Sequence, residues 1–250
     1  MDSTRNFSGL AAEYTAGRPV YAEAFLESLY ARHGFSAESV VADIGSGTGK
    51  FAKQLLDRGS AVWCVEPNED MRRTAGRELG GYAKFRAVNG TAAETTLADA
   101  SVDFITAAQA FHWFDVSAFQ KECRRILKPG GCVFLIWNLR DMTDEMNRRC
   151  HAVHAAYCPA FRGFGGGIRK DDARIGRFFD GQYAYEEFDN PLLYSREKFL
   201  SRSLSGSYSL QQGDARYADY IAALSGIFDE YAENGVLTMA NRTVVYSGTL

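Results

Sequence analysis

The sequence has few features that would direct the protein to a membrane, a nucleic acid or an oxidising compartment. No apolar run approaches the roughly 20 residues of a membrane-spanning helix, and residues 1–6 lack the apolar core of a signal peptide. The five cysteines show no Cys-x-x-Cys spacing, which is typical of reduced thiols. A net charge of −3 offers no basic surface for nucleic acid. We therefore expect a cytoplasmic protein without a nucleic-acid or membrane partner.

Metal-binding patterns are scarce as well. Cys150, His151, His154 and Cys158 recur at a helical spacing that brings several of them to one face. No neighbouring element supplies matching ligands, so ordinary packing explains these residues better. We expect no metal site.

The part of the chain that does show a regular pattern alternates strands with helices. Apolar strands are predicted at 40–44, 61–66, 82–88, 102–108 and 132–137, and helices follow several of them. Such alternation implies a parallel sheet with right-handed crossovers and helices on both faces. Two later strands, at 183–188 and 242–248, complete a prediction of a Rossmann-like, doubly wound α/β fold with seven strands.

The chain length favours one domain over residues 1–250. Within it, we expect a cap segment at 1–34 and a ligand-binding core at 35–140. Residues 141–181 break the alternation and contain a glycine-rich run at 163–167, so they are predicted to form a helical lid insertion. Residues 182–250 are expected to add the last strands and helices.

A glycine-rich turn follows the first predicted strand, in the order Asp43-Ile44-Gly45-Ser46-Gly47-Thr48-Gly49-Lys50. Glycines permit positive φ and remove the Cβ atoms that would keep a ligand away from the backbone. The helix that begins after the turn offers free N–H groups. Open α/β sheets bind ligands at this end of the strands, so the turn predicts a small-molecule site.

Two common glycine motifs do not fit this turn. A P-loop needs Ser or Thr after Lys50 and glycine at position 44, where the chain has Phe51 and Ile44. The dinucleotide fingerprint needs its third glycine at Lys50. The chain instead has a second acid, Glu66, 21 residues after Gly45, and this carboxylate can accept hydrogen bonds from a ribose diol. An NAD-dependent oxidoreductase and a nucleoside-binding module without catalysis remain open alternatives.

With these motifs in view, the chain resembles the class I S-adenosylmethionine-dependent methyltransferases, and within them the small-molecule branch of trans-aconitate and quinone-precursor methyltransferases. The resemblance is carried by residues 41–49, 65–68, 99–103, 107–114 and 127–131. It implies S-adenosyl-L-methionine as cofactor, S-adenosyl-L-homocysteine as product and an antiparallel last strand.

The resemblance also assigns cofactor-binding residues. Glu66 would hold the ribose hydroxyls, the turn would lie against the methionine part, and Thr91 stands where an aspartate is common in the family. The full set consists of Asp43, Gly45, Ser46, Gly47, Glu66, Pro67, Asn68, Met71, Thr91, Ala92, Ala108 and Gln109.

The acceptor is predicted to be a small molecule, with a carboxylate or hydroxyl oxygen favoured and methyl transfer by in-line displacement. Tyr14 and Arg18 resemble the family's covering segment and are candidate clamps, and His112 is a candidate base. A backbone-bonded loop histidine is the alternative for His112. The candidate substrate-binding residues, for which core packing is the alternative, are Phe111, Trp113 and Trp137. A monomer or homodimer is expected.

Overall fold

The computed structural model describes residues 19–164 and 172–250 of the chain. Tyr14 and Arg18 lie outside these described residues. The helices and strands follow in the order α2 (Glu23–Arg32), β1 (Val40–Ile44), α3 (Lys50–Leu56), β2 (Ala61–Val65), α4 (Glu69–Leu79), β3 (Phe85–Val88), β4 (Val102–Ala108), η2 (Phe111–Trp113), α5 (Val116–Ile126), β5 (Leu127–Arg140), α6 (Glu145–Tyr157), α7 (Ala173–Phe178), β6 (Ala184–Asp189), β7 (Leu192–Tyr194), α8 (Arg196–Leu204), α9 (Tyr217–Tyr231), β8 (Leu237–Met239) and β9 (Asn241–Gly248).

The elements form two compact units. Among the described residues, the sheet unit comprises 19–137, 172–188 and 243–250, and the helical unit comprises 138–164 and 189–242. The predicted segment 141–181 is therefore shared, with α6 in the helical unit and α7 in the sheet unit. Whether the chain acts as one domain with a lid stays a prediction.

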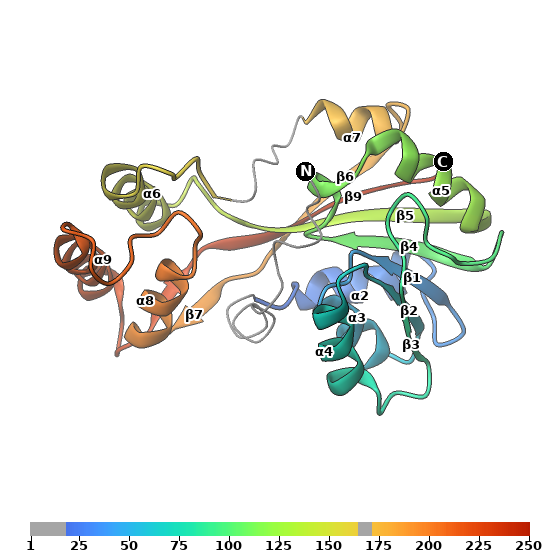
Figure 1. The fold of residues 1–250 in the computed structure, drawn as a ribbon, viewed down its shortest axis with the longest axis horizontal. Helices are drawn as coiled ribbons and strands as arrows, with labels where there is room; N and C mark the ends of the chain where they lie inside the picture. The colour runs from blue at the N-terminus through green and yellow to red at the C-terminus, as the bar shows by residue number, and fades with distance from the viewer. Residues whose placement is uncertain (1–18, 165–171) are drawn as a thin grey trace. The chain divides into compact units, whose positions relative to one another are not determined.

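The sheet unit is built on a seven-stranded sheet in the order β3-β2-β1-β4-β5-β9-β6 (Figure 1). β1 pairs in parallel with β2 and β4, and the β2–β3 and β4–β5 pairs are parallel as well. β9 is antiparallel to β5. The start of β5 lies beside the end of β9, where Cys132 Sγ donates to the Gly248 carbonyl, and Asp141 N, after the end of β5, donates to the Ala240 carbonyl before the start of β9. The predicted Rossmann-like sheet with an antiparallel last strand is confirmed.

Successive side chains of β5 point to opposite faces of the sheet and pack against different helices. Phe134 and Ile136 join one buried cluster with residues of α2 and α3, in which Phe25 stacks on Phe51 at 6.1 Å between ring centroids. On the other face, Phe119 of α5 stacks on Phe178 of α7 at 5.0 Å. Helices thus cover both faces of the sheet, as the doubly wound prediction requires.

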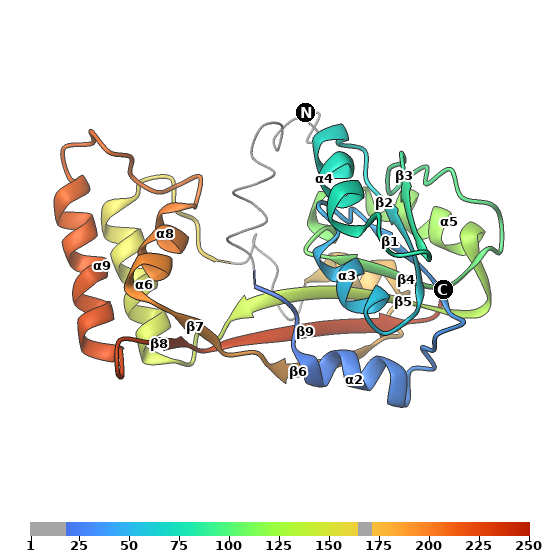
Figure 2. The ribbon, with the colours of Figure 1, turned by 90° about the horizontal axis from the view of Figure 1, so that it is seen from below.

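The helical unit has its own core. The helices α6, α8 and α9 pack beside one another, and the antiparallel pair β7–β8 lies against them (Figure 2). Buried residues from all these elements form one cluster, including Cys150, Phe199, Tyr220, Leu224 and Leu237. Residues 192–239 therefore do not add to the main sheet, whereas the strands predicted at 183–188 and 242–248 join it as β6 and β9.

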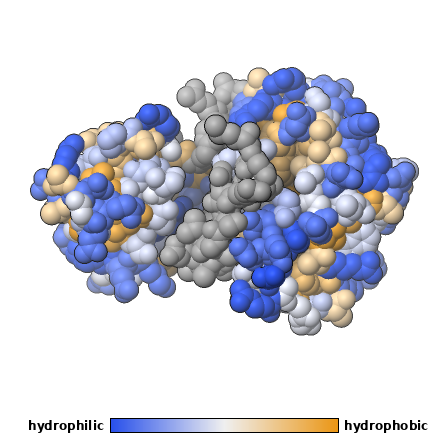
Figure 3. Space-filling model, in the orientation of Figure 1, coloured by the Kyte–Doolittle hydropathy of each residue, from blue (hydrophilic) through white to orange (hydrophobic). Residues whose placement is uncertain are grey.

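The face shown in Figure 3 carries hydrophobic residues in small patches among hydrophilic ones. In the part of the chain that the structure describes, no helix is long and apolar enough to cross a membrane.

Residues 89–101, between β3 and β4, contain no helix, and a buried carboxylate holds them to α5. Glu122 Oε1 accepts hydrogen bonds from Thr95 N at 2.7 Å and from Thr95 Oγ1 at 2.6 Å. Arg125 donates to the same carboxylate and to the Leu97 carbonyl. Burial works against ionisation, but these hydrogen bonds outweigh it and hold the pKa of Glu122 at about 2.

Replacing this carboxylate should cost stability in a pH-dependent way. At pH 7 we expect Glu122→Gln to lower the free energy of unfolding by roughly 1–3 kcal/mol, because Arg125 loses a buried charged partner. A lowered pKa stabilises the fold above the carboxyl's ordinary pKa, and this contribution fades as the pH falls toward about 2. Urea unfolding at pH 7, 5 and 3 should show the gap to wild type narrowing.

The matched control is Glu69→Gln, which breaks the exposed pair between Glu69 and Arg73 on α4. We expect little change in stability for this variant. Equal losses for both variants would contradict a special role of Glu122.

Candidate active site

The glycine-rich turn connects β1 to α3 with three residues in the left-handed region. The φ angles of Gly45, Gly47 and Gly49 are +68°, +57° and +79°, a conformation that glycine adopts at little cost. Gly45 N donates to the Val65 carbonyl at 2.8 Å, so the start of the turn is bonded to the end of β2.

The three glycines differ in the space around them. A Cβ on Gly49 would lie 2.4 Å from Cδ1 of the buried Leu79, and a Cβ on Gly45 would lie 2.8 Å from that of Ala110. A Cβ on Gly47 would meet nothing within 4 Å. Gly45 and Gly49 are therefore required by packing, whereas the space beside Gly47 is open to a ligand.

Glu66, at the end of β2, is oriented by the turn and by the start of α4. Its Oε2 accepts from Gly47 N at 3.0 Å and its Oε1 accepts from Asn68 N at 2.9 Å. Burial raises the pKa of the Glu66 carboxyl, and the two backbone hydrogen bonds oppose this effect. Each carboxylate oxygen keeps a further lone pair that can accept a hydroxyl.

A cavity of about 230 Å³ lies at this end of the strands, entirely within the sheet unit. It brings together most of the predicted cofactor residues with one predicted substrate residue, Trp113. The predicted residues that line it are Gly45, Gly47, Glu66, Pro67, Met71, Thr91, Ala92, Gln109 and Trp113.

Four lining residues were missing from the prediction, namely Ala93, Ala110, Phe114 and Asp115. Asp115 also caps α5 by accepting a hydrogen bond from Ala118 N at 2.8 Å. An aspartate is a common capping residue in a sequence, but nothing in Asp115 pointed to a cavity.

The other predicted cofactor residues do not line the cavity. Asn68 caps α4 through Met71 N, so it holds Glu66 and Met71 in place. Ser46 belongs to the turn, and Ala108 ends β4. Asp43 is buried beneath the turn, and its Oδ1 accepts from Thr106 Oγ1 at 2.8 Å. The assignment of these four to cofactor contact stays a prediction.

Side chains near the end of β4 divide between the cavity and the core. Trp113 is 50% exposed and lines the cavity. Phe111 and Trp137 are fully buried, and their rings meet edge to face at 6.2 Å between centroids. For these two residues the structure favours core packing over direct substrate contact. His112 is in the short helix η2 and does not line the cavity.

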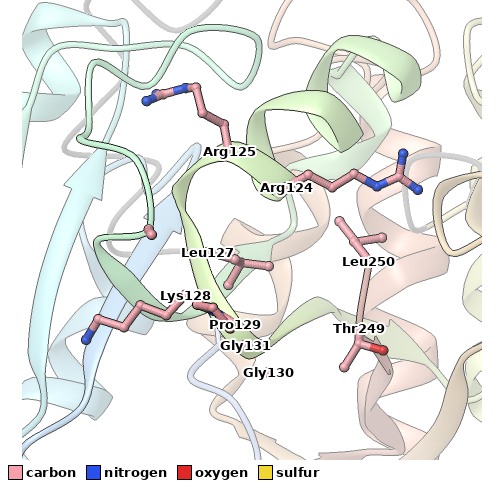
Figure 4. Close-up of a pocket in the computed structure, with 10 residues that line it drawn as sticks. Arg124, Arg125, Leu127, Lys128, Pro129, Gly130, Gly131, Thr249 and Leu250 are labelled. Carbon is pink, nitrogen blue, oxygen red and sulfur yellow. The ribbon is translucent and has the colours of Figure 1, made fainter.

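A second cavity, of about 310 Å³, lies at the opposite ends of β4 and β5 (Figure 4). Three cations border it, but each is paired: Arg124 with Asp180, Arg125 with Glu122 and Asp99, and Lys128 with Asp103. Ligands of open α/β sheets bind at the carboxyl ends of the strands, so the Glu66 cavity is the better candidate.

Within the described ranges, no group of three or more His, Cys, Asp and Glu residues could hold a metal ion. Cys150 and His154 lie in the core of the helical unit.

The buried Asp43 predicts a pH dependence of stability. Burial raises the pKa of Asp43 to about 7, Thr106 opposes the rise and Glu66 adds to it. A carboxyl whose pKa is raised in the folded state costs stability as the pH rises from its ordinary value to about 7. Asp43→Asn should therefore raise the free energy of unfolding at pH 8, by roughly 1–3 kcal/mol, and change it little at pH 4.5.

Chemical unfolding of the ligand-free protein at the two pH values measures this difference. Thr106→Val serves as the partner control, since it removes the hydroxyl that supports the Asp43 carboxylate and should lower stability at pH 8. An Asp43→Asn variant that is destabilised equally at both pH values would contradict the raised pKa.

Comparison with known proteins agrees with this geometry. Residues 42–135 match the methyltransferase domain family. An uncharacterized methyltransferase from Mycobacterium tuberculosis is 36% identical over 140 residues, which cover 56% of this chain and 55% of that protein. The chain thus spans about half the length of the curated relatives it matches.

Solved structures show the same fold. One described as a type II methyltransferase from Anaeromyxobacter dehalogenans has a TM-score of 0.64 at 20% identity, covering 92% of this chain and 97% of that one. Geranyl diphosphate C-methyltransferase from Streptomyces coelicolor, solved with S-adenosyl-L-homocysteine, has a TM-score of 0.50 at 16% identity, covering 91% and 79%. Matched sequence, strand order and the cavity beside the glycine turn agree: residues 42–135 are similar to the methyltransferase domain family and lie in a sheet of the Rossmann-like methyltransferase fold.

Proposed function

We propose that this protein transfers the methyl group of S-adenosyl-L-methionine to a small-molecule acceptor, with a carboxylate or hydroxyl oxygen favoured. The observation that carries the proposal is the hydrogen bond between Gly47 N and Glu66 Oε2 at the edge of one cavity. This contact brings the open side of the turn and an oriented carboxylate to the same ligand space.

The residues present fit the cofactor. The carboxylate of Glu66 suits the two ribose hydroxyls, because its oxygens keep free lone pairs. The open space at Gly47 suits the methionine part, which needs close access to the backbone. Met71, Thr91 and Ala92 border the same cavity and would flank the adenosine. When bound, S-adenosyl-L-methionine supplies an activated sulfonium methyl group.

Because that methyl group is already activated, the task of the chain is to position the acceptor and to exclude water. Alignment of two reactants can lower a barrier by about 7–11 kcal/mol. Trp113 and Gln109 border the cavity near the end of β4. Trp113 would contact the acceptor, and Gln109 would lie against the cofactor. Gln109 has a φ of +56°, and strained backbone of this kind is frequent at functional sites.

The remaining roles are also part of the proposal. His112 is the candidate base for an acceptor that must lose a proton, and a carboxylate acceptor needs none. Tyr14 and Arg18 are the candidate clamps. Geranyl diphosphate, the acceptor named for one structural relative, is a small molecule, which is in keeping with a small acceptor here. We also propose that the protein is cytoplasmic and is a monomer or a homodimer.

Two glycine variants separate cofactor binding from folding. Gly47→Ala should cost only about 1–2 kcal/mol of stability, since its Cβ meets no atom, but should weaken S-adenosyl-L-homocysteine binding at least about tenfold by filling the ligand space. Gly49→Ala should cost more stability, roughly 2–4 kcal/mol, because its Cβ collides with Leu79. Calorimetric titration and urea unfolding of both variants measure the two effects, and the reverse ranking would contradict the assignment.

The activity itself is tested by methyl transfer from isotopically labelled S-adenosyl-L-methionine to a panel of carboxylic acids, phenols and amines. We expect product from at least one oxygen acceptor. Glu66→Gln should bind S-adenosyl-L-homocysteine about tenfold more weakly or worse, because a charged hydrogen-bond acceptor is lost. Glu69→Gln, three residues away on the surface of α4, should bind it like wild type. Product from amines alone would exclude the oxygen preference, and equal binding by both variants would exclude the role of Glu66.

A further inference from the structure

We propose that the helical unit contains a second ligand site, which binds a small organic carboxylate between Arg140 and His154. Both residues belong to this unit, at the end of β5 and on α6. The site is separate from the Glu66 cavity, all of whose residues lie in the sheet unit.

Arg140 is a half-buried cation without an acidic partner in the described part of the chain. Its guanidinium lies over the ring of Phe164 at 3.9 Å from the centroid, and its Nη1 is inaccessible to solvent and has no hydrogen-bond partner there. Arginine stays protonated in proteins. An N–H group that is shut off from water and has no acceptor is costly, so Nη1 points to an acceptor that is bound from outside.

His154 presents a second unsatisfied polar atom to the same aromatic cluster. Its ring meets Phe164 edge to face at 5.4 Å between centroids, and its Nδ1 bonds to Tyr220 Oη at 2.8 Å. Its Nε2 is buried and lacks a partner among the described residues. Burial, together with the positive charge of Arg140, lowers the pKa of His154 to about 4, so the ring is neutral at pH 7. When Nδ1 accepts the tyrosine proton, Nε2 carries a hydrogen and can donate it.

The titratable groups facing Arg140 leave its charge uncompensated. They are Cys150, Arg202, Tyr208 and Tyr194. Burial raises the pKa of the Cys150 thiol and of the Tyr208 hydroxyl, so both are neutral at pH 7, and Arg202 adds a second positive charge. No carboxylate is among these groups.

These features define the ligand class. A guanidinium offers a planar fork of N–H donors that matches a carboxylate. The side chains around His154 are aromatic, since Phe161 and Tyr208 lie at about 5.3 Å from it between ring centroids. Aromatic neighbours favour a flat organic body over a strongly hydrated inorganic anion. The expected ligand is therefore a carboxylic acid with an aromatic or conjugated body.

Binding is measured by calorimetric titration with benzoate, cinnamate and inorganic phosphate in the absence of S-adenosyl-L-methionine, so the result does not depend on the proposed activity. We expect at least one of the two acids to bind wild type. Arg140→Met should weaken that binding about tenfold or more, and Arg140→Lys, which keeps the charge but loses the fork, should weaken it less. Without ligand, Arg140→Met should unfold at higher urea than wild type, because the uncompensated charge is gone.

The matched control is Arg216→Met in the same unit. Arg216 also lies over an aromatic ring, that of Tyr157 at 4.4 Å, but it is exposed and donates to the Ala156 carbonyl. This variant should bind the acid like wild type. Failure of both acids to bind, equal binding by the Arg140 and Arg216 variants, or binding of phosphate alone would overturn the proposal.

Adding S-adenosyl-L-methionine to the bound acid distinguishes the two ligand sites. An acid that stays unchanged by mass spectrometry supports a site separate from the Glu66 cavity. A methyl ester whose formation is unaffected by Arg140→Met would place the acid in the Glu66 cavity and overturn the proposal. If the wild-type protein fails to bind S-adenosyl-L-homocysteine but binds the acid, the proposed methyltransferase activity is contradicted and the acid site is not.

Discussion

The parallel register of β1 and β2 is the constraint on which the Glu66 cavity depends. Ile44 pairs with Val65, so the two strands end at the same level and their next residues, Gly45 and Glu66, emerge side by side. Gly45 N then bonds to the Val65 carbonyl and Gly47 N to the Glu66 side chain. A slip of one residue would turn the Glu66 side chain to the other face of the sheet and remove it from the turn.

The same constraint explains why the packing around the turn is so specific. Gly49 leaves room for Leu79 of α4, and Gly45 leaves room for Ala110 after β4. The turn is thereby fixed from two sides, by elements that follow β2 and β4. Of the three glycines, Gly47 alone has room for a Cβ with no atom within 4 Å, and this is where a ligand can reach the backbone without disturbing the fold.

The sequence predicted the sheet well because strands and turns are encoded locally. Two strands are marked by apolar runs rich in β-branched residues. One run leads to Asp43 and is followed by glycine, and the other leads to Glu66 and is followed by a capping asparagine, so the sequence indicates both the strand and where it ends. The cavity followed from the sheet rule that carboxyl ends of parallel strands meet, together with the family resemblance. Nine predicted residues line it for that reason.

What the sequence could not predict depends on contacts between distant elements. An aromatic residue after a strand packs equally well in a core or beside a ligand, and only the position of α7 against α5 shows that Phe111 is covered. The separation of residues 189–242 from the main sheet depends on the pairing of β7 with β8. Both strands are too short for the sequence to predict this pairing. The isolation of Arg140 is likewise visible only when its surroundings are known, since arginine in a sequence is ordinarily a surface residue.

The central claim is that the cavity beside the glycine turn selects S-adenosyl-L-methionine and not a nicotinamide dinucleotide. Thermal unfolding of the wild-type protein with S-adenosyl-L-homocysteine and, separately, with NADH tests it most directly. A ligand of the native state at a hundred times its Kd adds about 2.7 kcal/mol of stability, which is readily seen as a higher Tm. The account predicts a concentration-dependent rise with S-adenosyl-L-homocysteine and none with NADH, and the opposite result would contradict it.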